Sequence, residues 1–381
     1  MELDNNNRTA LREDPGKRPF WAGVIVRVLI GGLLFFFLLV QLSYIHRGYD
    51  RMMRFYGLPK QSLDAVVVGT SSTFTSYMPM EVWNEDGIAS AVAATNMQFE
   101  GTLVHTIREI RKYQTPKVWI IDLMPFIRGH YAGQEAWNGG DRNLNIRYNV
   151  DSMRWSKNRM DLIHEICGDY GLGIRDEIYY NFDLTRYHMT KAELSRFGNA
   201  VRDLNYGYQH LQKEGGEPFD VSVMTEGTEK ETPLEGTERK NLDGLLSEAA
   251  LLKQSGAEVV FLFQPFWFET EEEAGRKTWL CRILSEQGFR FWDLTSEKEA
   301  AGLIPDEDFR DFLHFDSLGS MKSTRLISSH LKQDFSLPDH RQDPDYASWN
   351  ADYPQWAELR GGYLNVDTAA AAADKEKEEG R

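Results

Sequence analysis

Cysteine is scarce in this sequence, with only Cys167 and Cys281 among 381 residues. Two cysteines are too few for a disulfide framework, and they lack the paired spacing of a structural zinc site. Phosphate-binding turns are also lacking, because GTSSTF at 69–74 contains neither a glycine-rich dinucleotide turn nor a Gly-Lys-Ser/Thr element. We therefore expect no metal and no cofactor, and the sequence disfavours a nucleotide-dependent enzyme.

The chain lacks a basic surplus outside its N-terminal part, and its formal net charge is −15. Residues 1–60 contain nine Lys and Arg against five Asp and Glu, so the first 60 residues carry +4 and the remainder −19. An acidic body of this kind repels phosphate backbones. We therefore expect no nucleic acid partner.

One long hydrophobic run lies near the N-terminus. Residues 19–45 read PFWAGVIVRVLIGGLLFFFLLVQLSYI, which as a helix is long enough to cross about 30 Å of hydrocarbon. Trp21 and Tyr44 lie near its two ends, where interfacial aromatic residues are common, and the long side chain of Arg27 can reach the nearer interface. The run at 19–45 predicts one transmembrane helix that contacts the lipid bilayer, preceded by an N-terminal tail at 1–18.

The residues after this run favour an uncleaved signal anchor. QLSYIHRGYDRMMRFYG offers bulky and basic residues where a signal peptide needs a small-residue cleavage site. Basic residues are balanced on the two sides of the run, so the distribution of charge does not orient it. These residues are Arg8, Arg12, Lys17 and Arg18 before it, and Arg47, Arg51, Arg54 and Lys60 after it.

Apolar runs alternate with amphipathic helical patterns across residues 62–335. This alternation indicates a parallel sheet with helices on both faces. We therefore expect an α/β fold, a three-layer α/β/α sandwich around a mainly five-stranded parallel sheet. The expected strands are Leu63 to Val68, Ser90 to Ala94, Val118 to Ile121, Glu258 to Phe263 and Phe289 to Trp292.

Three other segments flank or interrupt this predicted domain. Residues 46–61 are expected to form a juxtamembrane linker, and residues at about 127–236 an insertion that ends in a polar, Gly- and Thr-rich loop. Residues 336–381 show little periodicity and end in DTAAAAADKEKEEGR. We expect an irregular C-terminal tail with a disordered end.

A hydroxyl cluster follows the first expected strand, where Gly69 is succeeded by Thr70, Ser71 and Ser72. In an open α/β sheet, sites form beyond the carboxyl ends of the strands. A serine there becomes a nucleophile when a histidine and a carboxylate activate it, whereas Ser and Thr at a helix start also act as caps. Asp311 and His314 have a spacing that lets the carboxylate reach the imidazole on one turn of irregular or helical chain.

The order of these motifs resembles that of the SGNH (GDSL-type) hydrolase superfamily. The resemblance assigns Ser71 as nucleophile, His314 as base and Asp311 as its orienting acid, and leaves Ser72 and Thr73 as helix caps. The second motif, TNMQFEG, supplies Asn96 and Gly101, and the resemblance implies that the Gly101 N–H joins that of Ser71 in an oxyanion hole.

The sequence departs from the superfamily pattern at the third motif, because Met124, Pro125 and Phe126 stand where an Asn is expected. The chain is most similar to a membrane-anchored branch that includes the teichoic acid D-alanylation protein DltD and the alginate O-acetylation proteins. That resemblance implies a single-pass cell-membrane protein with an extracytoplasmic esterase or O-acyltransferase domain, and therefore a cytoplasmic tail at 1–18. It further implies a cell-envelope glycopolymer, a teichoic acid or exopolysaccharide, as substrate and a membrane-bound O-acyltransferase as partner.

Other readings remain open at this point. The missing Asn favours a non-catalytic binding or assembly module within an acyl-transfer complex. Asp316 is a second acid near His314, and Asp122 and His130 follow the third strand. Gln264 and Pro265 also follow a strand, while His105 and His164 lie within helical patterns.

Overall fold

A single apolar helix precedes the folded body of the protein. The computed structural model describes residues 20–47, 49–129, 142–151, 153–182, 184, 188–211, 221–225 and 227–379. Helix α1 spans Phe20–His46, and its most apolar 18-residue window has a mean hydropathy of 2.6 and is not buried against the rest of the chain, whereas Tyr44 and Ile45 near its end are buried. This helix is long and apolar enough to cross a membrane, as the sequence predicts.

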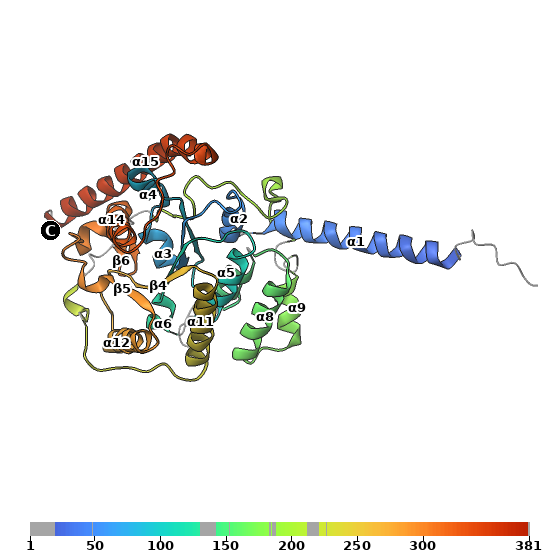
Figure 1. The fold of residues 1–381 in the computed structure, drawn as a ribbon, viewed down its shortest axis with the longest axis horizontal. Helices are drawn as coiled ribbons and strands as arrows, with labels where there is room; N and C mark the ends of the chain where they lie inside the picture. Colours follow the sequence, from blue (N-terminus) through green and yellow to red (C-terminus); the bar gives the residue numbers. More distant parts are fainter. Residues whose placement is uncertain are drawn as a thin grey trace, which may run out of the picture.

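A five-stranded sheet forms the centre of the body, and all its strands are parallel (Figure 1). The spatial order is β2-β1-β3-β4-β5. The bounds are β1 Ala65–Gly69, β2 Ser90–Ala94, β3 Val118–Asp122, β4 Glu258–Phe263 and β5 Arg290–Asp293. All five predicted strands are therefore confirmed, with their ends shifted by two residues at most.

Side chains on both faces of the sheet are buried, because helices cover each face. Val66 and Val68 belong to the core on the side of α5, α11 and α12, whereas Ala65 and Val67 belong to the core on the side of α3, α4 and α14. This explains why β1 reads as an unbroken apolar run. The helices are α3 Ser71–Ser76, α4 Pro79–Asp86, α5 Thr102–Ile110, α11 Gly236–Gln254, α12 Glu271–Glu286 and α14 Ser317–Asp334.

A short antiparallel hairpin connects β5 to α14. After η3 (Leu294–Ser296) and α13 (Pro305–Asp308), strand β6 (Phe309–Asp311) pairs with β7 (His314–Phe315). The Phe315 ring centroid lies 4.5 Å from that of Phe309 and 4.9 Å from that of Phe266, which follows β4. Aromatic packing thereby fixes the hairpin beyond the carboxyl end of the sheet.

The region expected to be a juxtamembrane linker is ordered and packed. Helix α2 (Arg51–Tyr56) buries Met52, Met53 and Phe55 against the body. Just before it, the buried Arg47 side chain donates to the Met153 carbonyl at 2.8 Å and to Asn199 Oδ1 at 3.1 Å. Helix α1 therefore joins the domain through buried contacts.

The predicted insertion contributes mainly helices in the part that the structure describes. They are α6 Met124–Arg128, α7 Arg142–Val150, α8 Lys157–Asp169, α9 Ile174–Asn181, η1 Leu194–Arg196 and η2 Val221–Val223. Arg147 and Asp151, both buried, form an ion pair at 3.0 Å that links α7 to the residue after its end. Because the pair is buried, removal of either partner would leave an unpaired buried charge and destabilise the fold.

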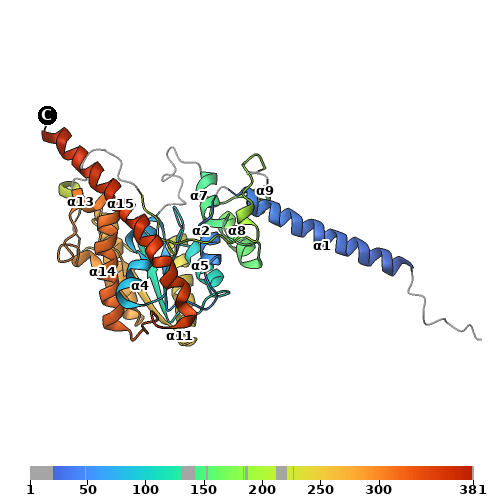
Figure 2. The same cartoon turned by 90° about the horizontal axis from the view of Figure 1, so that it is seen from above.

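The expectation of an irregular C-terminal tail is wrong for most of its length. After η4 (Pro344–Tyr346), helix α15 runs over Ala347–Glu379, alongside α14 and α4 (Figure 2). Its inward side chains recur at alternating steps of four and three, as on one face of a helix. Polar members of this series hid the pattern in the sequence. The series is Trp349, Tyr353, Trp356, Arg360, Tyr363 and Asp367.

Candidate active site

Ser71 is the first residue of α3, directly beyond the carboxyl end of β1. Thr70 is the N-cap of that helix, and its N–H donates to Thr73 Oγ1 at 3.0 Å. The expectation that Ser72 and Thr73 are the caps is therefore wrong for Ser72, while Thr73 takes part as the third helical residue. Among the three hydroxyl residues, Thr70 and Ser72 are buried, and only Ser71 is partly exposed.

Gly69 is required by close packing under the turn that carries Ser71. A Cβ atom at this position would lie 2.0 Å from Thr73 Oγ1 and 2.8 Å from the Cβ of Asp122. Neither neighbour is the free end of a long side chain, so any larger residue would displace the turn that carries Ser71. The predicted role of Gly69 in binding substrate stays a prediction, while its packing role follows from these distances.

His314 and Asp311 are brought to Ser71 by the β6–β7 hairpin. The Nε2 of His314 lies 2.9 Å from Ser71 Oγ. The Nδ1 lies 2.9 Å from both carboxylate oxygens of Asp311. A carboxylate only accepts hydrogen bonds, so Nδ1 carries the proton and Nε2 is left to accept from the serine hydroxyl.

Asp311 is held ionised by its surroundings. Burial acts to raise the pKa of this carboxyl, but the His314 ring and the N–H groups of Leu313 and His314 together bring the pKa below its usual value. The His314 side chain is 18% exposed and that of Asp311 37%. His314 is therefore the more buried of the two side chains, and a negative charge is fixed beside its Nδ1.

A buried acid lies beneath the nucleophile turn. Asp122, at the end of β3, accepts from Thr73 Oγ1 at 2.6 Å, from the Met124 N–H at 2.9 Å and from Gln264 Nε2 at 3.3 Å. Burial raises the pKa of this carboxyl to about 6, against the lowering effect of those hydrogen bonds. Gln264 also donates to Ser76 Oγ at 2.9 Å, so the ends of β3 and β4 both support α3.

The predicted oxyanion residues make their described contacts elsewhere. A Cβ at Gly101, the N-cap of α5, would lie 3.1 Å from Asn241 Nδ2 on α11. The N–H of Asn96 donates to Tyr49 Oη at 3.0 Å, and its buried Oδ1 has no hydrogen-bond partner among the described residues. Their contribution to an oxyanion hole stays a prediction.

The second motif contacts the nucleophile turn through a residue that the sequence analysis missed. The N–H of Gln98 donates to Thr70 Oγ1 at 3.2 Å, and its side-chain Oε1 accepts from the Thr95 N–H at 3.2 Å. Both Gln98 and Thr70 are buried. Polar residues between a strand end and a helix start are a signal for this role, but the family motif assigns functions only to Asn96 and Gly101 at its two ends.

The remaining candidates have other partners. Asp316 is the N-cap of α14 and accepts from the N–H groups of Leu318 and Gly319, so it does not orient His314. His105 lies 3.0 Å from Asn158 and 3.2 Å from Glu165, and His164 lies 3.0 Å from Glu177. His130 lies outside the described residues, and beyond β3 the chain enters α6 directly.

The C-terminal helix also supports the site, through a contact the sequence did not predict. Asp367 of α15 is buried and accepts from the N–H of Ser317 at 2.9 Å and from its Oγ at 2.5 Å. The same carboxylate lies 2.9 Å from His210 Nε2. Ser317 begins α14 three residues after His314, so α15 braces the end of the hairpin that carries the base.

Comparison with known proteins identifies no family for this chain. No family model, no curated protein and no solved structure matches the chain. Among the residues that the structure describes, no group of three or more His, Cys, Asp or Glu is arranged to hold a metal ion. The interpretation of the site therefore depends on its own geometry.

Proposed function

We propose that this protein is a serine esterase or O-acyltransferase. The observation that carries the proposal is the continuous set of contacts from Ser71 Oγ through the His314 ring to the Asp311 carboxylate, each at 2.9 Å. A serine, a histidine and a carboxylate in this order activate the serine hydroxyl on several unrelated folds. Their place beyond the carboxyl end of a parallel sheet supports the same function.

The contacts define the order of proton movements. His314 Nε2 takes the Ser71 proton as Oγ attacks the ester carbonyl, while Asp311 stabilises the imidazolium that forms. The imidazolium then gives its proton to the departing alcohol oxygen, which leaves an acyl group on Ser71. Water or a sugar hydroxyl next gives a proton to Nε2 and attacks the acyl carbonyl. The imidazolium then returns that proton to Ser71 Oγ as the bond between Oγ and the acyl group breaks, which yields hydrolysis or transfer.

The negative charge on the carbonyl oxygen needs donors during this reaction. The N–H of Ser71 lies in the first turn of α3, where backbone N–H groups have no acceptor within the helix. The SGNH resemblance adds the Gly101 N–H and leaves the third donor without its Asn. One such donor contributes about 3 kcal/mol to transition-state stabilisation, so we expect modest rates.

The substrate class and location of the proposed enzyme come from the resemblance and from α1. We propose an SGNH-type three-layer domain, anchored in the cell membrane by α1 as a single span and placed on its outer side. The substrate is then an acyl ester of a cell-envelope glycopolymer, a teichoic acid or exopolysaccharide. A membrane-bound O-acyltransferase is the proposed partner. The apolar, unburied surface of α1 supports the anchor.

A second candidate function is a non-catalytic binding or assembly module on the same fold. The observation that favours it is the absence of an Asn after β3, where Met124 and Pro125 begin α6. Such a module would keep the fold but would not react at Ser71.

The distinguishing experiment is labelling of the full-length protein by a fluorophosphonate, together with hydrolysis of an activated acetyl ester. We expect the wild type to react at Ser71 and S71A to lose both signals. Ser72 is the matched control, because it is the adjacent hydroxyl and is buried, so S72A should keep them. Absence of a Ser71 adduct, where a serine esterase in the same buffer is labelled, would support the non-catalytic module instead.

A further inference from the structure

Exposed apolar side chains gather in one part of the insertion. Outside α1, the most exposed of them in the part of the chain that the structure describes are Met189, Leu194 and Val223, which are 85%, 78% and 71% exposed. The first two belong to a group of six within 24 residues of sequence, which we name the insertion face. It consists of Ile174, Ile178, Phe182, Met189, Leu194 and Phe197.

Two of the six residues form a stripe on α9. Ile174 and Ile178 are four residues apart on this helix, and residues four apart lie on the same side of a helix, so these two side chains project together. Phe182 follows the end of the helix, where the backbone is no longer helical. A soluble domain seldom exposes so many large apolar side chains in one place unless that surface binds something.

The insertion face is fixed to the last turns of α1. The Glu193 N–H donates to the Ile45 carbonyl at 2.8 Å, and the Gly198 N–H donates to Gln41 Oε1 at 2.9 Å. His46 Nδ1 lies 2.9 Å from the Thr190 carbonyl oxygen. The segment 190–198 therefore lies beside the C-terminal part of the apolar helix.

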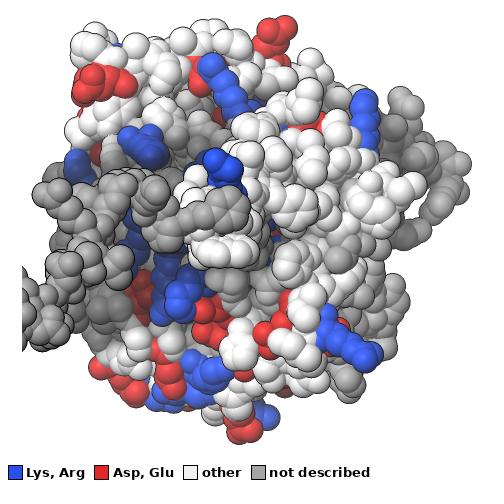
Figure 3. Space-filling model, turned by 90° about the vertical axis from the view of Figure 1, so that its right-hand side faces the viewer, with Lys and Arg blue, Asp and Glu red and all other residues white. Residues whose placement is uncertain are grey.

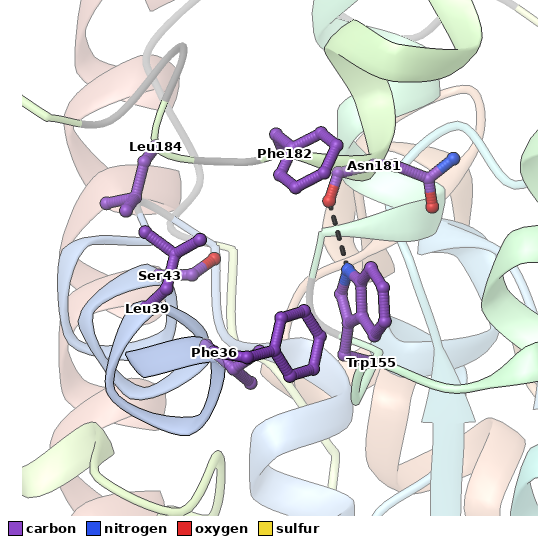
Figure 4. A pocket seen from close by; sticks show the side chains of 8 residues that line it. Phe36, Leu39, Ser43, Trp155, Asn181, Phe182 and Leu184 are labelled. Atoms are coloured by element: carbon purple, nitrogen blue, oxygen red, sulfur yellow. Dashed lines mark hydrogen bonds between the residues drawn. The ribbon is translucent and has the colours of Figure 1, made fainter. Parts of the chain in front are cut away.

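An apolar recess lies between the insertion and α1 (Figure 4). It encloses about 70 Å³ and is lined on the α1 side by Phe36, Leu39 and Val40. The Trp155 ring packs edge-on to Phe36 with centroids 4.8 Å apart, and Phe182 faces the same recess. The insertion thus reaches Phe36, ten residues before the end of α1, which is about 15 Å along a helix.

The length of α1 places these contacts at the depth of a bilayer boundary. A hydrocarbon core of about 30 Å takes up about 20 helical residues, whereas α1 has 27. With Trp21 at one interface, the other interface falls near Gln41. Phe36 and Leu39 are then in the outer part of the hydrocarbon, and Trp155, which packs on Phe36, reaches about the same depth. The segment 190–198, which contacts Gln41 and Ile45, is at the level of the headgroups.

The charges around α1 are compatible with a lipid surface. Figure 3 shows the face from which α1 projects: Lys and Arg side chains are scattered among mostly uncharged ones, and Asp and Glu lie mainly toward its lower edge. Arg175 and Lys191 are exposed beside the apolar residues. Long basic side chains at such a boundary reach phosphate groups while their stems cover apolar surface.

We propose that the insertion face is a second membrane contact, which inserts into the headgroup region of the bilayer where α1 ends. This inference rests on the proposed role of α1 as a membrane span. The domain is then held at one angle to the membrane by two contacts instead of turning freely on a linker. Figures 1 and 2 place α14 and α15 on the side of the body opposite to α1.

The test is spin-label accessibility in the full-length protein reconstituted into phospholipid nanodiscs. Single cysteines are introduced at Ile178 and Leu194, and also at Leu251 of α11 and at Ile304, which are 48% and 44% exposed. Cys281 is replaced by Ser, and Cys167 is buried. Retained fluorophosphonate labelling, or an unchanged melting temperature if the wild type is not labelled, shows that each variant is folded.

The ratio of collisions with oxygen to collisions with a water-soluble nickel chelate should be severalfold higher at positions 178 and 194 than at positions 251 and 304. Equal ratios at all four would overturn the proposal. Low collision rates with both reagents, together with dipolar broadening between labels, would overturn it in favour of contact with a second copy. A label at Val28 separates the two hypotheses, because a water-like ratio there means that α1 itself does not span the bilayer.

Discussion

The Oγ of Ser71 lies 2.9 Å from the Nε2 of His314, although 243 positions separate the two residues in the chain. Ser71 follows β1, an inner strand next to the edge strand β2, and His314 lies on a hairpin that follows the opposite edge strand β5. The carboxyl ends of β1 and β5 lie at the same end of the sheet because the strands are parallel. The distance between these two atoms depends on Asp311, on the turn that carries Ser71, and on the helices that pack behind them.

Replacing Asp311 should abolish most of the reaction without unfolding the protein. In D311N the amide no longer fixes the proton on His314 Nδ1, so Nε2 loses its role as acceptor from Ser71. We expect kcat to fall by about 10²- to 10⁴-fold on the activated ester, with the melting temperature nearly unchanged. An equal loss of rate and of folded protein would contradict this assignment.

Asp316 is the matched control for Asp311, since it is also an acid within three residues of His314. Its carboxylate caps α14, so D316A should lower the free energy of unfolding by about 0.5–2 kcal/mol. The rate per folded molecule should stay within a fewfold of wild type at a temperature where both are folded. Denaturant titration and active-site titration on the same samples separate the two effects.

Substitution of Gly69 should damage both stability and the site. In G69A the new Cβ would meet Thr73 Oγ1 at 2.0 Å, so the turn must move and Ser71 moves with it. We expect a loss of about 1–3 kcal/mol in the free energy of unfolding and a strong reduction in fluorophosphonate labelling. G361A, inside α15 with no atom within 4 Å of its Cβ, should instead gain about 0.5–1 kcal/mol. Normal labelling of G69A would argue against the packing role.

Ionisation of Asp122 should make the protein less stable as pH rises toward neutrality. Its pKa is raised from 3.8 to about 6, so between these values the native state binds a proton that the unfolded chain has released. Stability attributable to this group therefore falls from about pH 4 to pH 6 and is constant above, by up to about 3 kcal/mol.

The difference in unfolding free energy between wild type and D122N isolates this effect from other titrating groups. Denaturant unfolding should show that the free energy of unfolding of the wild type, relative to that of D122N, is lower at pH 7.5 than at pH 4.5. A difference that does not change with pH would mean that Asp122 titrates normally. The comparison of the two proteins cancels the contributions to the free energy of unfolding from titrating groups that both proteins share.

The strands and the position of Ser71 at the end of β1 could be predicted from the sequence because each signal is local. Val66 to Val68 form a buried run that ends at a glycine, and Ser71 follows at the edge where sites form. The Asp311 and His314 pair was also visible, but the local geometry was not. The structure has a two-residue turn that makes them cross-strand neighbours, where the sequence suggested irregular or helical chain.

The supporting residues could not be predicted because their roles depend on tertiary contacts. Asp122 and Thr73 are 49 positions apart, and Gln98 and Thr70 are 28 apart. Helix α15 was missed because Arg360 and Asp367 occupy inward positions that a search for apolar periodicity discards. Arg360 pairs with Glu81 of α4, and Asp367 binds Ser317, so polar partners replace apolar burial there.

Removing the Asp367 carboxylate should slow the reaction through a residue that never contacts substrate. D367A leaves the buried Ser317 N–H and His210 without their acceptor, which costs about 1–3 kcal/mol in the free energy of unfolding. The start of α14 then loosens, and His314 loses its fixed distance from Ser71. We expect kcat to fall while KM for a small activated ester is nearly unchanged, because the acyl-binding surface is not altered. D367N, which keeps one acceptor oxygen, should recover part of kcat, and the exposed neighbour variant T368A should behave as wild type. If D367A lost stability but kept the wild-type kcat per titrated site, α15 would serve the fold alone.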